Sequence, residues 1–119
     1  MTPFGQRLRE LRAERGISLK QMAEELNLSS AYLSALEHGQ RGKPSPGLVM
    51  QILGALNVIW DEAEELKALA ELSHPKVTLD TSGLSPTATE LANRLHSNIR
   101  TMSEDRLRIL LTLVKGAIK

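Results

Sequence analysis

The stretch that decides the fold runs from residue 18 to residue 39, SLKQMAEELNLSSAYLSALEHG. Ser18 has a hydroxyl that can cap a helix, and Gln21 stands three residues later, where a capping box places Glu or Gln. Asn27 tolerates the left-handed conformation that ends a helix, and Ser29 can cap a second helix directly afterwards. The stretch therefore predicts two short helices joined by a turn of about three residues, with the final glycine ending the second helix.

Apolar residues recur at helical spacing within both predicted helices. They are Leu19, Met22, Ala23 and Leu26 in the first helix and Leu33 and Leu36 in the second. Two helices joined by so short a turn have the geometry of a DNA-binding helix-turn-helix, in which the second helix lies in the major groove. In that geometry the side chains that face DNA are Ser29, Ser30, Ala31, Tyr32, Ser34, Ala35 and His38. Most of them are short and would let the helix approach base edges closely.

The same region resembles a known family. The residues that carry the resemblance are Leu11 to Ser18, Met22, Ala23, Ser29 and Leu33 to Gly39. Together they are similar to the Cro/lambda-repressor-like (XRE) family of DNA-binding regulators, over about residues 4–60. The resemblance implies a lambda-repressor-like helical bundle. It also implies a structural ion pair between Arg12 on the first helix and Glu37 at the end of the recognition helix.

The chain departs from the family pattern at a few positions. Leu19 stands where the family often has Gln, and Asn27 where Gly is common. Ser30 and Ala31 occupy positions at which members that read adenine frequently carry Gln, so a bidentate adenine contact of that kind is missing. The identity of the operator bases therefore does not follow from the sequence.

The segment after the recognition helix, residues 40–46, is rich in turn-forming residues and carries two cations, Arg41 and Lys43. By composition it is an ordinary solvated loop. Its position beside the recognition helix favours a second interpretation, because the equivalent loop lies against the DNA backbone in related proteins. We expect Arg41 and Lys43 to contact phosphates.

The composition narrows the class of protein. The chain has 119 residues, no cysteine and a formal net charge of +1. We expect no disulfide, no membrane-spanning segment and a cytoplasmic location, because the N-terminal residues lack the apolar core of a signal peptide. His38, His74 and His96 are scattered without a ligand pattern, so we expect no metal and no cofactor. No catalytic constellation is present in the sequence, and an enzyme is not expected.

Capping residues predict the other helices. Thr2 and Pro3 open a first helix over about residues 3–15, and Ser45 opens a fourth that ends near Asn57. Asp61 and Glu64 resemble a capping pair for a fifth helix. Trp60 is expected to be a packing anchor between the DNA-binding unit and the C-terminal part of the chain. These assignments give a DNA-binding domain over residues 1–60 and a connecting helix and linker over residues 61–84, in which Lys76 to Leu79 could form a short strand.

Residues 85–119 are expected to form a C-terminal helical dimerisation segment. Ser85 and Pro86 open one helix, and a break near Thr101 and Ser103 precedes a last helix over about residues 104–117. Apolar residues occupy more than one face of the last helix, and those expected at the dimer interface are Leu107, Leu110, Leu111, Val114 and Ile118. The alternative is that this helix folds back onto the first domain.

The sequence as a whole predicts an all-α protein, a lambda-repressor-like helix-turn-helix bundle with a C-terminal helical extension that dimerises. The expected function is sequence-specific binding of double-stranded DNA as a transcriptional regulator, with repression favoured over activation. One alternative is an antitoxin-type autorepressor that binds a toxin protein as its partner. Another is a protein-interaction module that has lost DNA binding.

Overall fold

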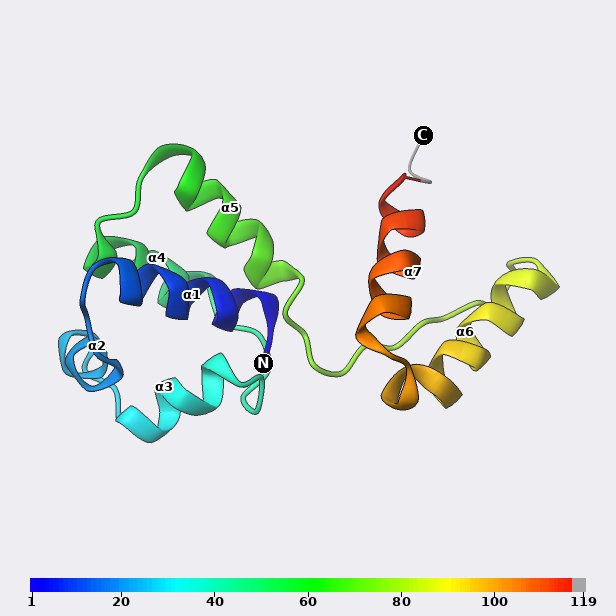
Figure 1. Ribbon diagram of the computed structural model, residues 1–119, viewed down its shortest axis with the longest axis horizontal. Coiled ribbons are helices and arrows are strands. Elements are labelled where there is room, and N and C mark those ends of the chain that lie inside the picture. The colour runs from blue at the N-terminus through cyan, green and yellow to red at the C-terminus, as the bar shows by residue number, and fades with distance from the viewer. Residues whose placement is uncertain (117–119) are drawn as a thin grey trace. The chain divides into compact units, whose positions relative to one another are not determined.

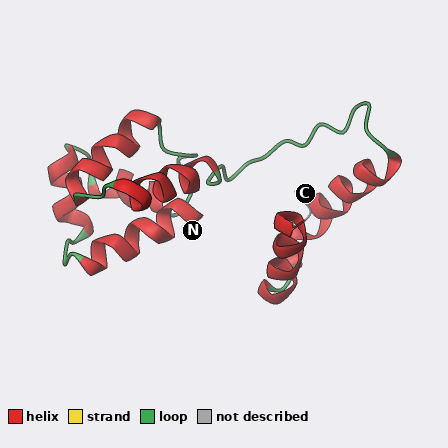
Figure 2. Ribbon diagram, turned by 90° about the horizontal axis from the view of Figure 1, so that it is seen from above, coloured by secondary structure: helices red, strands yellow, loops and turns green. Residues whose placement is uncertain are grey.

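The computed structural model describes residues 1–116, and every regular element in that range is helical (Figure 2). The elements are α1 (Pro3–Glu14), α2 (Leu19–Leu26), α3 (Ser30–Glu37), α4 (Pro46–Leu56), α5 (Trp60–Glu71), α6 (Pro86–Asn98), the short 3-10 helix η1 (Ile99–Thr101) and α7 (Glu104–Gly116). They form two compact units, one from Met1 to Val77 and one from Thr78 onward (Figure 1). The all-α prediction is confirmed. The strand expected at Lys76–Leu79 is absent, because the described residues offer no second strand to satisfy its backbone.

Short polar side chains begin most helices, as the sequence predicted. The Ser18 hydroxyl accepts a hydrogen bond from the Gln21 backbone N–H at 3.0 Å, and the Gln21 side chain accepts one from the Ser18 N–H at 2.8 Å. The remaining predicted caps are Thr2, Ser29, Ser45 and Ser85, each of which accepts from a backbone N–H three residues on. Left-handed Asn27 and Asn57 end α2 and α4. These caps satisfy backbone groups that a helix end otherwise leaves without a partner.

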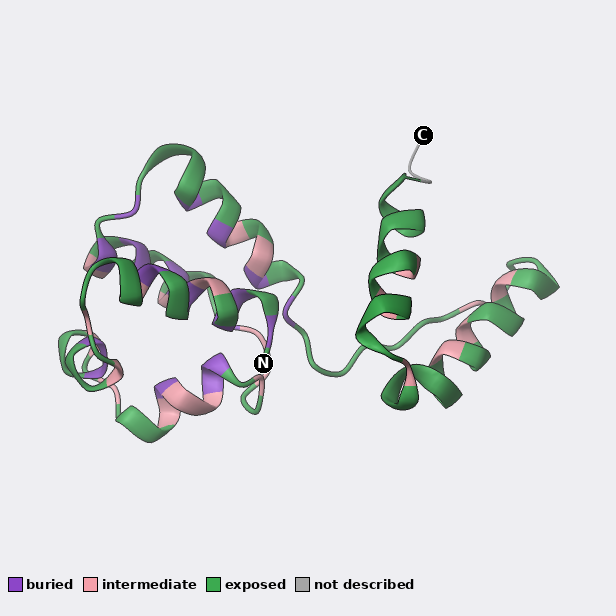
Figure 3. Ribbon diagram, in the orientation of Figure 1, coloured by how far each residue is buried: buried purple, intermediate pink, exposed green. Residues whose placement is uncertain are grey.

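A single apolar core holds the first unit together. It consists of Phe4, Leu8, Leu11, Met22, Ala23, Leu33, Leu36, Val49, Ile52, Leu53, Leu56, Val58, Ala63, Leu66 and Ala70. Each of the larger side chains contributes roughly 1.5–3 kcal/mol by leaving water. Figure 3 shows buried residues in all five helices of this unit.

The fifth helix belongs to this core. Leu66 is completely buried, Ala70 is nearly so, and α5 packs against α1 and α4. The first unit therefore extends to Val77 and does not end at residue 60, where we had placed its boundary. The helix that we expected to be a connection is part of the fold that carries the helix-turn-helix.

Two predictions at the start of α5 are wrong. The helix begins at Trp60, its N-cap is Ile59, and no side chain caps it, so Asp61 lies inside the first turn and is not its cap. Asp61 is still favourable there, because a carboxylate stabilises the positive end of the helix dipole. Trp60 is 81% exposed and anchors nothing within the first unit. Val58, two residues earlier, is the buried residue at this junction.

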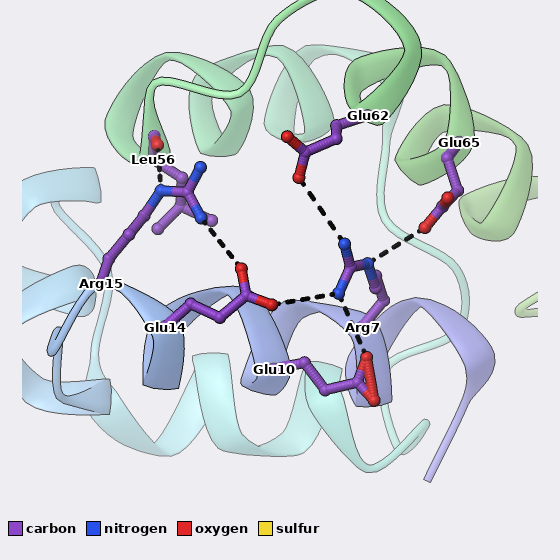
Figure 4. A network of polar contacts seen from close by, with 7 residues as sticks. All are labelled: Arg7, Glu10, Glu14, Arg15, Leu56, Glu62 and Glu65. Atoms are coloured by element: carbon purple, nitrogen blue, oxygen red, sulfur yellow. Dashed lines mark hydrogen bonds and ion pairs between the residues drawn. The ribbon is translucent and has the colours of Figure 1, made fainter.

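An arginine on α1 ties α5 to the bundle (Figure 4). Arg7 Nε donates to Glu65 Oε1 at 3.0 Å, and its terminal nitrogens lie 3.3 Å from Glu10, 3.7 Å from Glu14 and 3.6 Å from Glu62. Burial acts to lower the pKa of Arg7, but the hydrogen bond to Glu10 and the charges of Glu65 and Glu14 outweigh it and raise that pKa. The cation thus screens carboxylates on two helices that would otherwise repel one another.

The start of α1 is fixed by the end of the same unit. Ser73 is buried, and its hydroxyl accepts a hydrogen bond from the Phe4 N–H at 2.9 Å while donating to the Leu69 carbonyl at 2.6 Å. One side chain therefore satisfies a free donor at the beginning of α1 and a carbonyl near the end of α5. The contact spans 69 residues and joins the two ends of the first unit.

The second unit forms helices, but the part of it that the structure describes has no buried residue. Ser85 caps α6 and η1 makes the predicted break before α7, yet none of the residues 78–116 is buried. Its exposed apolar side chains are Leu79, Leu84, Leu91, Ile99, Ile109, Leu111, Leu113 and Val114. No helix within residues 1–116 is both long enough and apolar enough to cross a lipid bilayer.

Candidate nucleic-acid interface

The two helices of the predicted motif are joined by a turn over residues 27–29. Asn27 has φ 61° and ψ 39°, and the N–H of the following residue, Leu28, donates to the Ala23 carbonyl at 2.8 Å. Ser29 then accepts from the Tyr32 N–H at 3.0 Å and starts α3. Ala23 is buried, and α2 packs against α3. The local sequence therefore produces a helix-turn-helix.

None of the predicted DNA-facing residues is used by the core. Ser29, Ser30, Ala31 and His38 are exposed, and Tyr32, Ser34 and Ala35 are half-buried. Leu33, Leu36 and Glu37 are the buried residues of α3, so the core side and the open side of this helix are distinct. The open side carries hydroxyl and methyl groups, which allow close approach to a surface that presents hydrogen-bonding groups.

His38 ends α3 and turns one nitrogen back to the helix. Its Nδ1 lies 2.8 Å from the Ser34 carbonyl oxygen. Because a carbonyl can only accept, Nδ1 carries the proton in this contact. The exposed ring can offer its other nitrogen, Nε2, to a ligand.

The loop after α3 places its two cations differently. The Arg41 guanidinium lies over the Tyr32 ring, 5.7 Å from the ring centre, and the Arg41 side chain is exposed beside the start of the open side of α3. Lys43 instead pairs with Glu71, with 2.7 Å between Lys43 Nζ and Glu71 Oε2. Sequence reasoning proposed both residues as phosphate contacts and missed this partner, because Glu71 lies 28 residues away on α5.

Buried charges clamp the C-terminal end of α3 to α1. Arg12 Nε lies 3.1 Å from Glu37 Oε2, and a second guanidinium nitrogen donates to Glu37 Oε1 at 3.2 Å. Arg12 also donates to the Ile17 carbonyl at 3.3 Å. The Glu37 side chain is 3% exposed and that of Arg12 12%, so this is the paired arrangement that the family resemblance implied. A two-pronged pair of this kind fixes orientation as well as distance.

Gly5 lets the two helices approach closely at the same place. A Cβ built on Gly5 would lie 1.9 Å from the backbone oxygen of Glu37, so no other residue fits without moving the helices apart. The Thr2 N–H is also directed to the Glu37 carbonyl, at 3.4 Å. Neither Gly5 nor Ser73 was singled out from the sequence, since nothing in their neighbouring residues reveals a contact with a distant helix.

Four of the five residues predicted for dimerisation lie on α7. Leu107 and Leu110 are half-buried, and Leu111 and Val114 are exposed. Ile118 lies outside the described residues. The apolar surface that motivated the dimer prediction is thus present in α7.

Comparison with known proteins finds similarity to helix-turn-helix proteins. A family described as helix-turn-helix domain matches residues 3–66. The chain is 41% identical over 61 residues to the uncharacterized HTH-type transcriptional regulator RghRB of Bacillus subtilis, which covers 51% of this chain and 44% of that protein. It is 36% identical over 61 residues to the HTH-type transcriptional repressor RghR of the same organism, covering 51% of this chain and 45% of the repressor.

A third relative is matched over more of its length. The HTH-type transcriptional regulator SinR of Bacillus subtilis is 32% identical over 90 residues, which cover 69% of this chain and 81% of SinR. The match to RghRB and RghR spans less than half of either protein. These matches and the α2–turn–α3 geometry show that the chain belongs to the XRE-like helix-turn-helix family of DNA-binding transcriptional regulators.

Proposed function

We propose that this protein is a sequence-specific regulator that binds double-stranded DNA with α3 in the major groove and represses transcription. The observation that carries the proposal is the open side of α3, held in place by the bidentate Arg12–Glu37 pair and by the close approach at Gly5. A recognition helix has to present its side chains rigidly. When the helix is already fixed, less conformational entropy is lost as each contact with a base forms. The names of the relatives RghR and SinR support a regulatory rather than an enzymatic role.

The side chains of α3 suggest how DNA is contacted. Ser30 and Ser34 can exchange hydrogen bonds with any base edge, while Ala31 can pack against a thymine methyl group. Tyr32 and His38 bring polar groups to the two ends of the helix, where they reach a base edge or a phosphate. Such a surface makes few strong individual contacts, so specificity arises from close fit over several base pairs.

Arg41 and Lys43 provide the proposed contacts to the DNA backbone. Phosphate contacts release counterions, so each one steepens the dependence of affinity on salt by about 0.9 units of logarithmic slope. Replacing both residues with Ala should weaken binding to all sequences alike and flatten the slope by about one to about two units, with Arg41 contributing most because Lys43 already pairs with Glu71. An unchanged slope would exclude them as backbone contacts.

We propose that the protein acts as a homodimer in the cytoplasm, through the apolar residues of α7. Isolated exposed apolar side chains are common, but α7 carries four of them, Ile109, Leu111, Leu113 and Val114, within two turns. A second copy would cover them, and a two-fold dimer would present two recognition helices to half-sites about 34 Å apart. Sedimentation at micromolar concentration tests this, and a monomer under those conditions would refute it. A stable complex with a different protein in place of the dimer would favour the antitoxin-type alternative.

Footprinting on the DNA upstream of the protein's own gene tests the DNA-binding proposal. The decisive variant is Ala31→Glu, because Ala31 is exposed at the start of α3 and a carboxylate there is compatible with the helix dipole. The variant should fold normally and lose all protection, since the carboxylate would face the phosphate-lined groove. Ala68→Glu, at an exposed position on α5, is the matched control with the same added charge and should footprint like the unmodified protein. Equal footprints for both variants would contradict the assignment of α3.

A further inference from the structure

The ion pair between Lys43 and Glu71 joins the loop after α3 to the last residue of α5. Their charged atoms lie 2.7 Å apart, the Lys43 side chain is 32% exposed and the Glu71 side chain is 66% exposed. The contact is not local in sequence, because the two residues are 28 positions apart. It places a carboxylate directly on one of the two cations of the loop.

The end of α5 explains why Glu71 attracts this lysine. Backbone carbonyls at the C-terminal end of a helix carry partial negative charge, and α5 has no basic residue in its last turn. Glu71 adds a full negative charge at the same place, so an external cation is favourable there for two reasons. Accordingly, the hydrogen bond from Lys43 and the charge of Lys43 lower the pKa of the Glu71 carboxyl. The Glu71 carboxylate is therefore ionised throughout the neutral range and can act as a partner for Lys43.

A lysine that already has a carboxylate partner contributes little to DNA binding. Its charge is neutralised before DNA arrives, so a new contact with a phosphate exchanges one anion for another and gains little from counterion release. The Glu71 carboxylate also repels a nearby phosphate. Arg41, two residues earlier, has an aromatic ring as its neighbour and keeps its full charge available.

We propose that Glu71 competes with DNA phosphate for Lys43 and thereby limits the affinity of this protein for DNA. The proposal rests on the proposed function, in which the loop after α3 faces the DNA backbone. Glu71 acts as a positioning residue: it holds Lys43 at the end of α5 until a phosphate takes its place. The pair is exposed enough for this exchange, because solvent-accessible ion pairs shift an equilibrium by only about two- to fivefold.

A double-mutant cycle on the full chain tests the proposal. Binding to a mixed-sequence DNA duplex is measured across a salt series for the unmodified protein, Glu71→Gln, Lys43→Ala and the double variant. Glu71→Gln should raise affinity about two- to fivefold at low salt and steepen the salt slope by about 0.9 units, because Lys43 then meets phosphate with its charge unmatched. Lys43→Ala alone should change the slope little, and Glu71→Gln should not steepen it once Lys43 is gone.

Glu64→Gln is the matched control. Glu64 is an exposed carboxylate on the same helix, paired with Lys67 at 3.2 Å, and its removal changes the net charge by the same amount. It should leave affinity and slope unchanged, because Glu64 pairs with Lys67 on α5 and not with a cation of the loop after α3, and lies seven residues, or about 10 Å along the helix, before Glu71. Circular dichroism of all variants verifies that α5 is intact.

The outcomes separate two kinds of failure. An increase confined to Glu71→Gln and dependent on Lys43 supports the competition. If Glu71→Gln has no effect, weakens binding, or acts just as Glu64→Gln does, the competition is wrong while the DNA-binding function stands. If the unmodified protein binds no duplex at low salt, the proposed function itself fails and the competition falls with it.

Discussion

The two units of this chain use the same chemistry to form helices, but they differ in what becomes of their apolar side chains. A serine cap followed by proline starts α4 in the first unit and α6 in the second, with nearly identical geometry. The first unit nevertheless buries fifteen apolar residues and the residues described in the second bury none. Local sequence is therefore sufficient to form a helix, whereas burial requires a partner that local sequence does not specify.

This difference matches a division of roles. In the first unit, burial on one side of α3 leaves the other side fixed and open, as a DNA-contacting surface requires. In the second unit, apolar side chains on α6 and α7 remain in contact with water. Leaving such a surface exposed is unfavourable, which is why we assign it to association with a second copy. Substitutions in each unit can test whether the contrast is as sharp as the structure indicates.

Equivalent leucine truncations in the two units should have the most different effects. Leu66 is completely buried, so Leu66→Ala removes buried methyl groups and leaves a cavity that should cost about 2–5 kcal/mol of unfolding free energy. Leu111 is 57% exposed, and Leu111→Ala should change unfolding of the first unit by less than about 0.5 kcal/mol. Urea denaturation followed by far-ultraviolet circular dichroism measures both. Similar losses for the two variants would contradict the division into one unit with a core and one without.

Breaking the Arg12–Glu37 ion pair, which holds α3 against α1, should cause the next largest loss of unfolding free energy. Arg12→Met removes the guanidinium that pairs with Glu37 and leaves the carboxylate buried without that counter-charge. Breaking a buried pair in this way costs about 3 kcal/mol. Arg12→Lys retains the charge but loses the two-pronged geometry, so a smaller loss is expected. If Arg12→Met were as stable as the unmodified protein, the pair would not be what holds α3 against α1.

Two glycines in the first unit should respond in opposite directions to the same change. Gly5→Ala would place a Cβ against the Glu37 carbonyl and force α1 away from α3. The expected loss of unfolding free energy is about 3 kcal/mol, the upper end of the range for overpacking. Gly54 lies in the last turn of α4 with open space around an added Cβ. Gly54→Ala should stabilise the unit by about 0.5–1 kcal/mol, because alanine is the better helix former. Equal effects of the two substitutions in a thermal unfolding series would argue against the close approach.

The features that the sequence predicted correctly are those in which partners lie within a few residues. Ser18 and Gln21 form a capping box three residues apart, and Asn57 ends α4 in the left-handed conformation. The helix-turn-helix and the open side of α3 were predicted for the same reason, since caps and apolar spacing are local. The pairing of Arg12 with Glu37 spans 25 residues and was implied only by family resemblance.

The features that sequence reasoning missed depend on distant partners. Trp60 was expected to be a packing anchor because it is the only tryptophan and stands at a junction, but Val58 takes the buried position and the indole remains exposed. Arg7 reaches Glu65 across 58 residues, and nothing in its own helix reveals that contact. Lys43 was correctly seen as a cation beside the recognition helix, yet its partner on α5 could be found only in the folded structure.

The smallest expected effect concerns that last contact, which exists only if the first unit is folded with α5 in place. Because Lys43 lowers the pKa of Glu71, the carboxyl should titrate below its ordinary value of 4.5 in the folded protein and return toward it in Lys43→Ala. A lowered folded-state pKa stabilises the protein above the unfolded-state value, and this stabilisation is lost as the pH falls through the folded-state value. Carboxyl carbon NMR on the full chain measures the midpoint directly. A Glu71 midpoint that does not move when Lys43 is replaced would show that the pair does not persist in solution, and Lys43 would then be as available to a phosphate as Arg41.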